Sequence, residues 1–424
     1  MTEPKVISLG IFATAYVLFV LLPHKRTIVA VCGAILTVLL GAVSGKEAFL
    51  AINWNVMGIF VGILIVADIF IESRVPAYLA EIIVDRAKNT AWAILALCVL
   101  TSLISAFVEN VATVLIVAPI ALSIAHKLHI NPVKMMIVIA ISSNLQGAAT
   151  LVGDPPSMLL GGFAKMNFMD FFFYHGKPSI FFAVELGAIA SLVVLYLIFR
   201  SQRQKVPFVS VEKVRSWMPT GILTTLIVLL AASSFVDAGF SYMAGLLCMI
   251  FGVVSILWKK FATNGSLVRS IKSLDWDTTF FLMGVFVLVG SITLTGWIDI
   301  ISDSLSKLVG ENIFLGYTTL VFIAVLVSAF VDNIPFLAAM LPVAISMSQR
   351  LGIDPSLFLF GLLIGASLGG NITPIGASAN IITCGMLKKE GHVVRFGEFA
   401  KIGLPFTLVA VITAYLFVWF VWKP

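Results

Sequence analysis

Apolar runs long enough to cross a membrane recur along nearly the whole chain, from Val6 to the last few residues. A helix needs about 20 apolar residues to span the roughly 30 Å hydrocarbon layer. The runs, of which 404–419 is typical, are continuously apolar, whereas barrel strands alternate in segments of about ten residues. Only 11% of the residues are charged, against about a quarter in soluble domains. The sequence therefore predicts an all-α polytopic membrane protein and excludes an ordinary soluble enzyme.

The first half begins with three uninterrupted apolar runs, at 6–22, 27–44 and 55–72. Between 91 and 126, two apolar arms then flank the sequence SAFVEN. Each arm has about 16 residues and would reach only about 24 Å as a helix, so we expect a re-entrant hairpin rather than two crossings. Glycines, polar residues and a proline pair interrupt 132–162, which predicts a broken helix. A span near 179–199 closes this half.

The second half repeats this order of segments. Its three apolar runs lie at 217–235, 239–258 and 278–296. A hairpin at 314–348 around SAFVDN, a broken helix at 355–387 and a span at 402–422 follow. We therefore divide the chain into a first repeat (1–200), a cytoplasmic linker (201–216) and a second repeat (217–424).

Identical residues at matched positions support this internal repeat. Trp54 matches Trp276 and Gly62 matches Gly284, and from Ser105 onward the register shifts by one residue. The pairs beyond the shift are Ser105 and Ser328, Asn110 and Asn333, Pro119 and Pro342, Pro132 and Pro355, Thr150 and Thr373, and Gly153 and Gly376. Each half has five predicted membrane-crossing helices, one of them broken, and one hairpin. Because five is odd, the second half enters from the opposite side, and the two repeats are predicted to be inverted.

Basic residues set the expected orientation, since Lys and Arg concentrate in cytoplasmic loops. We place the loop that contains Lys25 and Arg26 inside. Seven of the 27 Lys and Arg residues then remain outside: Lys5, Lys46, Lys165, Lys177, Lys307, Arg350 and Lys423. Both termini are predicted to lie outside a cytoplasmic (inner) membrane. The basic residues of this chain gather at helix ends, so we expect a lipid bilayer and no nucleic acid as the partner.

Four interruptions bring polar groups to mid-membrane depth: the two hairpin tips and the two broken helices. In many secondary transporters, such breaks form the solute site, because helix ends inside the membrane offer unpaired N–H and C=O groups. The hairpin tips carry Glu109, Asn110, Asp332 and Asn333. A carboxylate at this depth needs a cation or a proton as its partner, which predicts a Na⁺ or proton site at these four residues. The alternative is that each acid caps the helix that follows it.

The other candidates are hydroxyls, amides and glycines in the same segments. Their oxygens suit a hard monovalent cation or a polar solute, or else satisfy backbone groups that the breaks release. The glycines let the backbone bend and approach closely. Asp154 precedes a proline pair and is expected to cap a helix. The full set of predicted binding residues is Ser105, Glu109, Asn110, Asn144, Gly147, Thr150, Gly153, Asp154, Ser328, Asp332, Asn333, Gly370, Asn371, Thr373, Gly376, Ser378 and Asn380.

Asp68 and Glu185 lie within predicted helices and are either proton relays or hydrogen-bond partners between helices. The five histidines fall in predicted loops, and the four cysteines lie in apolar runs without paired spacing. No nucleophile motif or phosphate-binding loop is found in the sequence. We therefore expect no enzymatic activity, and no cofactor beyond a transported or coupling Na⁺ or H⁺.

Four segments resemble the ArsB/NhaD and melanosomal P protein branch of the ion transporter superfamily: SAFVENVATVLIVAPIALS, NLQGAATLVGDPPSMLLG, SAFVDNIPFLAAMLPVA and SLGGNITPIGASANII. The similarity covers nearly the whole chain. The dicarboxylate/sodium symporters are more distantly similar and carry Ser-Asn-Thr at each tip. Here Asn110 and Asn333 match the asparagine, and Glu109 and Asp332 replace the serine. The resemblance implies that hairpins and broken helices move against a scaffold in an elevator-like motion, within a homodimer.

A carboxylate at each tip disfavours a multiply charged anion and favours a cation, a proton or a neutral hydroxylated solute. We therefore expect a secondary active transporter, specifically a proton- or sodium-coupled antiporter of Na⁺ or of a neutral metalloid acid such as arsenite. A sodium-coupled symporter of carboxylates or oxyanions is the first alternative, and the absence of Lys and Arg at the four breaks argues against it. A passive ion channel is an alternative of another class.

Overall fold

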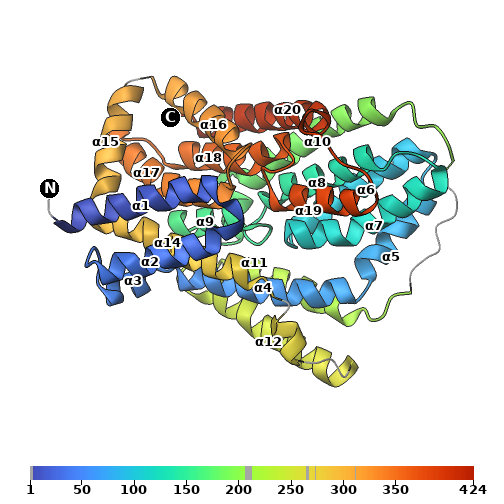
Figure 1. The fold of residues 1–424 in the computed structure, drawn as a ribbon, viewed down its shortest axis with the longest axis horizontal. Helices are drawn as coiled ribbons and strands as arrows, with labels where there is room; N and C mark the ends of the chain where they lie inside the picture. The colour runs from blue at the N-terminus through green and yellow to red at the C-terminus, as the bar shows by residue number, and fades with distance from the viewer. Residues whose placement is uncertain (1–2, 206–212, 264–266, 273, 311) are drawn as a thin grey trace.

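The computed structural model describes residues 3–205, 213–263, 267–272, 274–310 and 312–424, and this part of the chain is nearly all helical (Figure 1). Part of the predicted linker, 206–212, lies outside the described residues. Up to the linker the elements are α1 (Glu3–Leu21), η1 (Pro23–Lys25), α2 (Arg26–Leu39), α3 (Gly45–Ala51), α4 (Trp54–Glu72), α5 (Val75–Asp85), α6 (Thr90–Ser105), α7 (Asn110–Leu128), α8 (Val133–Gly147), α9 (Pro155–Ala164), η2 (Met169–Phe171), β1 (Phe173–Tyr174), β2 (Lys177–Pro178) and α10 (Ile180–Phe199). Beyond it they are α11 (Met218–Ser233), α12 (Met243–Thr263), α13 (Leu267–Lys272), α14 (Trp276–Leu294), α15 (Trp297–Val309), α16 (Ile313–Ser328), α17 (Asn333–Leu351), α18 (Ser356–Gly369), η3 (Gly370–Ile372), α19 (Ser378–Lys389) and α20 (Phe396–Trp422).

Eight of these helices are long and apolar enough to cross a membrane: α1, α4, α7, α10, α12, α14, α17 and α20. Five shorter apolar helices accompany them, including α6, α8, α16 and α18. The predicted all-α, multi-pass membrane protein is therefore confirmed. The predicted hairpins contain α6 with α7 and α16 with α17, and the predicted broken helices contain α8 with α9 and α18 with α19. Their re-entrant course and the inversion of the repeats stay predictions.

The apolar run predicted to span 27–44 is shorter than expected. Helix α2 ends at Leu39, and Gly41 then turns the chain with a φ of 71°. Ser44 starts the separate helix α3 through a capping box, in which its side chain accepts from the Glu47 N–H and its own N–H donates to the Glu47 carboxylate. The apolar run continues past Leu39 to Val43, so hydropathy alone placed the helix end too late.

The helices pack in two groups. In the first group α4 packs on α12 and α2 packs on α14, while in the second group α10 packs on α20 and α16 on α18. In Figure 1, α4 and α12 lie along the lower edge and α16, α18 and α20 along the upper edge. The groups meet where α9 contacts α4 and where α17 contacts α14. Residues at this junction are therefore held by helices from both groups.

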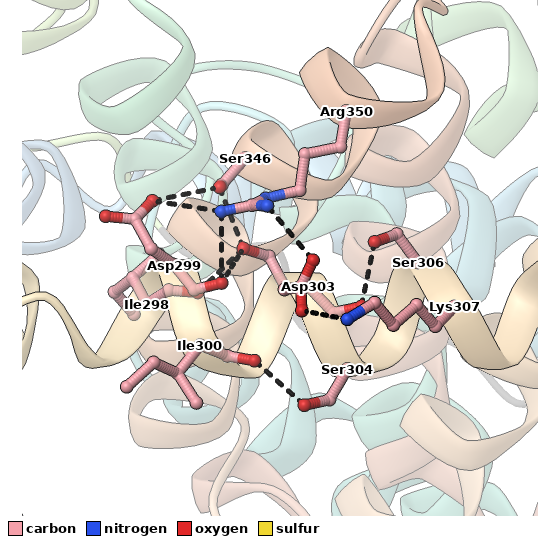
Figure 2. Close-up of polar contacts among 10 residues, drawn as sticks. Ile298, Asp299, Ile300, Asp303, Ser304, Ser306, Lys307, Ser346 and Arg350 are labelled. Carbon is pink, nitrogen blue, oxygen red and sulfur yellow. Dashed lines mark hydrogen bonds and ion pairs between the residues drawn. The ribbon is translucent and has the colours of Figure 1, made fainter.

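Helix α15 connects the two groups and is fastened to α17 by a polar network (Figure 2). Arg350 on α17 pairs with the Asp303 carboxylate at 3.2 Å and donates to the Asp299 carbonyl oxygen at 3.2 Å. Beside them, the Ser302 and Ser346 hydroxyls lie 2.8 Å apart. These contacts join the connecting helix to the second helix of the predicted hairpin rather than leaving it as a free loop.

Helices α4 and α12 approach each other so closely that glycines are required. A Cβ added at Gly58 would lie 3.1 Å from the Gly245 Cα, and one added at Gly62 would collide with the Cys248 backbone carbonyl. Gly58 and Gly62 form the small-residue spacing that brings membrane helices into backbone contact. Close packing of this kind holds the first group of helices together where lipid offers no hydrophobic driving force.

Replacing Gly62 with Ala tests this contact. Gly62→Ala should push α4 and α12 apart and lower the free energy of unfolding by about 1–3 kcal/mol, the usual cost of overpacking. Thermal unfolding of the purified protein in detergent measures the effect as a lower melting midpoint. Gly10→Ala is the matched control, because a Cβ at Gly10 meets nothing within 4 Å. Equal midpoints for the two variants would contradict the close packing.

Candidate functional site

The two hairpin turns are built alike and place one acid each at a helix start. Helix α6 ends at Ser105, and Glu109 caps α7 by accepting a hydrogen bond from the Ala112 N–H at 3.0 Å. Helix α16 ends at Ser328, and Asp332 caps α17 by accepting from the Ile334 N–H at 3.0 Å. Capping therefore occurs at both tips. It leaves one oxygen of each carboxylate for a further partner.

Hydroxyl groups hold each turn against the neighbouring broken helix in the same way in both halves. Thr150 donates to the Ala106 carbonyl oxygen, and Thr373 donates to the equivalent Ala329 carbonyl oxygen. Ser105 donates to the Ser143 carbonyl oxygen at 2.9 Å, and Ser328 donates to the equivalent one, that of Ala366. In this structure these hydroxyls satisfy backbone groups that the breaks release, which is the supporting role considered above.

The first break is tight, and glycine is required at its centre. A Cβ at Gly147 would lie 2.6 Å from the Asn110 side-chain oxygen and 2.8 Å from an Asp154 carboxylate oxygen. Gly153 approaches the Gly147 backbone closely, and Gly376 approaches Gly370 in the same manner. Asp154 caps α9 through a 2.9 Å bond from the Ser157 N–H, as its place before two prolines predicted.

Three buried asparagines join the two broken helices. The Asn144 amide nitrogen donates to the Asn371 side-chain oxygen at 3.0 Å and to the Asn380 side-chain oxygen at 2.9 Å. The Asn380 nitrogen in turn donates to the carbonyl oxygens of Gly370 and Thr373, both at 2.9 Å. The first and second halves of the chain are thus linked directly at the centre of the protein.

A cavity of about 560 Å³ lies beside this network, at the junction of the two groups of helices. Five carboxylates line it, from Glu109, Asp154, Asp275, Asp277 and Asp332. Of the predicted binding residues, those that line the cavity are Glu109, Asn110, Asn144, Asp154, Asp332, Asn333, Gly376 and Ser378. Those outside its lining are Ser105, Gly147, Thr150, Gly153, Ser328, Gly370, Asn371, Thr373 and Asn380. Acidic groups therefore dominate its charge.

Arg26, at the start of α2, is a cavity residue that the sequence analysis missed. Its guanidinium forms an ion pair with Asp332, lies 4.9 Å from the centre of the Phe281 ring, and reaches the Thr278 hydroxyl at 3.4 Å. The break segments themselves contain no Lys or Arg, but the fold brings Arg26 to the second of the two tips. Sequence placed Arg26 in a loop, and no local signal shows that a helix start folds against a tip 306 residues away.

The two isolated acids of the sequence analysis lie outside the cavity lining. Asp68 on α4 lies 3.5 Å from the Lys259 ammonium of α12, which also contacts Glu72 at 2.6 Å. Glu185 on α10 accepts a hydrogen bond from the Gln146 side-chain amide of α8. Both acids therefore make contacts between helices, the second of the two roles considered.

A multi-pass helical fold with a polar cavity between two groups of helices is the architecture expected of a membrane transporter. The sequence profile described as "Citrate transporter" (CitMHS) matches residues 16–349 and 243–424, and the chain belongs to this family. An uncharacterized transporter of Mycobacterium tuberculosis is 30% identical over 98% of both chains. The human P protein is 25% identical over 95% of this chain and 58% of its own length. These relatives confirm the resemblance to the ion transporter superfamily.

Solved structures show the same fold at low sequence identity. The YdaH transporter of Alcanivorax borkumensis superposes with a TM-score of 0.62 at 14% identity, covering 99% of this chain and 98% of that one. The MtrF protein of Neisseria gonorrhoeae was reported in a study of antimetabolite efflux pumps. It superposes with a TM-score of 0.57 at 14% identity, covering 100% of this chain and 96% of that one. The fold is thus that of polytopic transporters.

The hydrogen bond from Thr373 can be tested by substitution. Thr373→Val should leave the Ala329 carbonyl oxygen without its donor and lower the free energy of unfolding by about 1–3 kcal/mol. Thr383→Val is the matched control, because the buried Thr383 hydroxyl has no hydrogen-bond partner. Melting midpoints in detergent measure both. A control variant as unstable as Thr373→Val would show that loss of a buried hydroxyl, and not of this bond, is responsible.

Proposed function

We propose that this protein is a secondary active transporter that moves a cation or a neutral solute, coupled to Na⁺ or H⁺, through the acidic cavity. The observation that carries the proposal is the charge around the cavity: five carboxylates face one arginine, and that arginine is already paired with Asp332. A bare, multiply charged anion would meet repulsion there. Two like charges 4 Å apart repel by about 4 kcal/mol at an effective dielectric constant of about 20.

Glu109 and Asp332 are the proposed exchange groups for the coupling ion. Each carboxylate uses one oxygen for a backbone N–H and lines the cavity with the rest of its side chain. A proton or Na⁺ at Glu109 would lower the electrostatic cost of holding a carboxylate within the membrane. At Asp332 the incoming cation competes with Arg26, so loading of the site is linked to release of the ion pair.

The junction of the two groups of helices supports an elevator-like motion. Arg26 and Asp275 belong to α2 and to the start of α14, whereas Glu109 and Asp332 belong to the hairpin tips. Displacement of one group against the other would carry the tips across the membrane. The loops at Arg26 and Asp275 are predicted to be cytoplasmic, so the cavity is assigned to an inward-facing state. We further propose a homodimer in the cytoplasmic membrane, with both termini outside.

A carboxylate symporter is the second candidate, and Arg26 is the observation that favours it. An arginine can pair with a carboxylate through two parallel hydrogen bonds, so Arg26 could exchange Asp332 for a substrate carboxylate. The family description, citrate transporter, points in the same direction. The two candidates require opposite effects of removing Arg26.

Neutralising the tips tests the coupling. Glu109→Gln and Asp332→Asn should each reduce gradient-driven uptake into proteoliposomes by at least tenfold while the protein remains inserted and folded. Uptake is measured under an imposed pH gradient and then a Na⁺ gradient, with sodium, arsenite and citrate offered in turn. Asp299→Asn on α15, outside the cavity lining, is the control and should transport normally. Normal uptake by both tip variants would show that the two acids act only as helix caps. Wild-type solute that equilibrates across the membrane regardless of either gradient would indicate a channel.

Substitution of Arg26 separates the two candidate cargoes. In a cation or neutral-solute carrier, Arg26→Gln removes the competitor for Asp332, so half-maximal coupling should occur at a lower Na⁺ or H⁺ concentration. In a carboxylate symporter, the same change should abolish citrate uptake. Concentration dependence in proteoliposomes distinguishes the two outcomes. The cation or neutral-solute carrier would be ruled out if the wild type takes up citrate under a Na⁺ gradient and Arg26→Gln does not.

A further inference from the structure

Two residues of the cavity lining each have a buried polar side-chain atom without a hydrogen-bond partner. These atoms are the side-chain oxygen Oδ1 of Asn144 and the hydroxyl Oγ of Ser367, and the two residues are only 3% and 2% exposed. Within the described residues, no other cavity-lining residue has a buried side-chain nitrogen or oxygen without a partner. Leaving a buried polar atom unpaired costs the folded protein about 1–3 kcal/mol. A ligand that paired with these two atoms would remove that cost.

The orientation of the Asn144 amide follows from its neighbours. The Asn380 nitrogen donates both of its protons to backbone carbonyls, and the Asn371 nitrogen donates to the Ile141 carbonyl oxygen at 3.2 Å. Both residues therefore direct their side-chain oxygens towards Asn144, so Asn144 donates to them through its amide nitrogen. Rotating the Asn144 amide would place oxygen against oxygen. The free Asn144 Oδ1 is thus an acceptor that only a donor or a cation can satisfy.

Ser367 occupies the position of Asn144 in the second half of the chain. Each residue directly follows the carbonyl that receives the hairpin serine bond, that of Ser143 or of Ala366. Each also stands three residues before the glycine at its helix break, Gly147 or Gly370. Helices α8 and α18 contact each other, and Asn144 bonds to Asn371, which lies one helical turn beyond Ser367. The two residues therefore line the same cavity from two helices that contact each other, one from each half of the chain.

We propose that Asn144 Oδ1 and Ser367 Oγ are ligands of a single hard monovalent cation, with Na⁺ as the probe, at the point where the two halves meet. Neutral amide and hydroxyl oxygens are suitable ligands for such an ion. The carboxylates that line the same cavity supply the charge that attracts it. A role for this site in transport rests on the proposed function. The coupling ion would then bind at Asn144 and Ser367 as well as at the hairpin tips.

Ligand-induced stabilisation of the purified full-length protein in detergent tests the site without any transport assay. Na⁺ should raise the melting midpoint of the wild type in a saturable manner, because a ligand that binds only the folded state stabilises it. Ser367→Ala should raise the apparent Kd for Na⁺ about tenfold. This variant breaks no hydrogen bond within the protein, since the hydroxyl has no partner. Ser356→Ala on the same helix is the control, because its buried hydroxyl is also unpaired but lies away from the cavity.

Asn144→Ala should weaken Na⁺ binding at least as much as Ser367→Ala, and it also removes two bonds to Asn371 and Asn380. Its lower stability in the absence of Na⁺ is therefore expected, and Ser367→Ala remains decisive if Asn144→Ala does not fold. A wild-type midpoint that is equal in Na⁺, Li⁺ and K⁺, or an unchanged Kd in Ser367→Ala, overturns the site. If the Na⁺ site fails this test but gradient-driven uptake is still observed, the proposed function is retained. If Na⁺ binds at the site but no gradient drives uptake, the proposed function is wrong and the site is retained.

Discussion

Backbone groups released by helix breaks inside a membrane must find partners within the protein, and this requirement organises the centre of the molecule. Threonine hydroxyls at the two breaks donate to the alanine carbonyls that follow the hairpin serines, and those serines donate to the next helix. Asn380 then satisfies two further carbonyls. Because water is absent from the hydrocarbon layer, loss of one such bond leaves a group with no substitute partner. The polar residues near the cavity thus divide into those that hold the breaks together and those that remain free to meet a solute.

Arg26 gives the cavity its second distinguishing property. Among the described residues that line the cavity, it alone carries a permanent positive charge, and it contacts the tip of the second hairpin from the start of α2. Packing over the Phe281 ring holds the guanidinium in place. The Arg26–Asp332 ion pair therefore joins the first group of helices to the second across the cavity. The relative movement of the two groups proposed above would separate these two charges.

The sequence predicted the long apolar helices and the positions of both breaks, because hydropathy, prolines and glycines act locally; it left support of the breaks and solute binding as open alternatives for the polar residues there. The predicted end of α2 was too late, since the apolar run continues through Gly41 as far as Val43. Arg26 and Ser367 were missed for a different reason. A basic residue at a helix start is usual for a membrane protein, and a serine in an apolar helix has no unusual local signal. Their positions depend on contacts between distant segments, which composition and spacing do not encode.

The matched backbones of the two halves carry unmatched side chains, and this has an electrical consequence. Asp154 stands at the first break where Ala377 stands at the second, and Arg26 neutralises Asp332 but forms no ion pair with Glu109 in the described part of the chain. The two matched breaks therefore differ in charge: Glu109 and Asp154 give the first break and its hairpin tip two carboxylates without an arginine partner in the described residues, whereas Asp332 at the second tip is paired with Arg26. Asp275 and Asp277 add two further carboxylates to the cavity from the second half of the chain. A transport cycle built on these two halves would therefore pass through end states of unequal electrostatic energy, even though the backbones match.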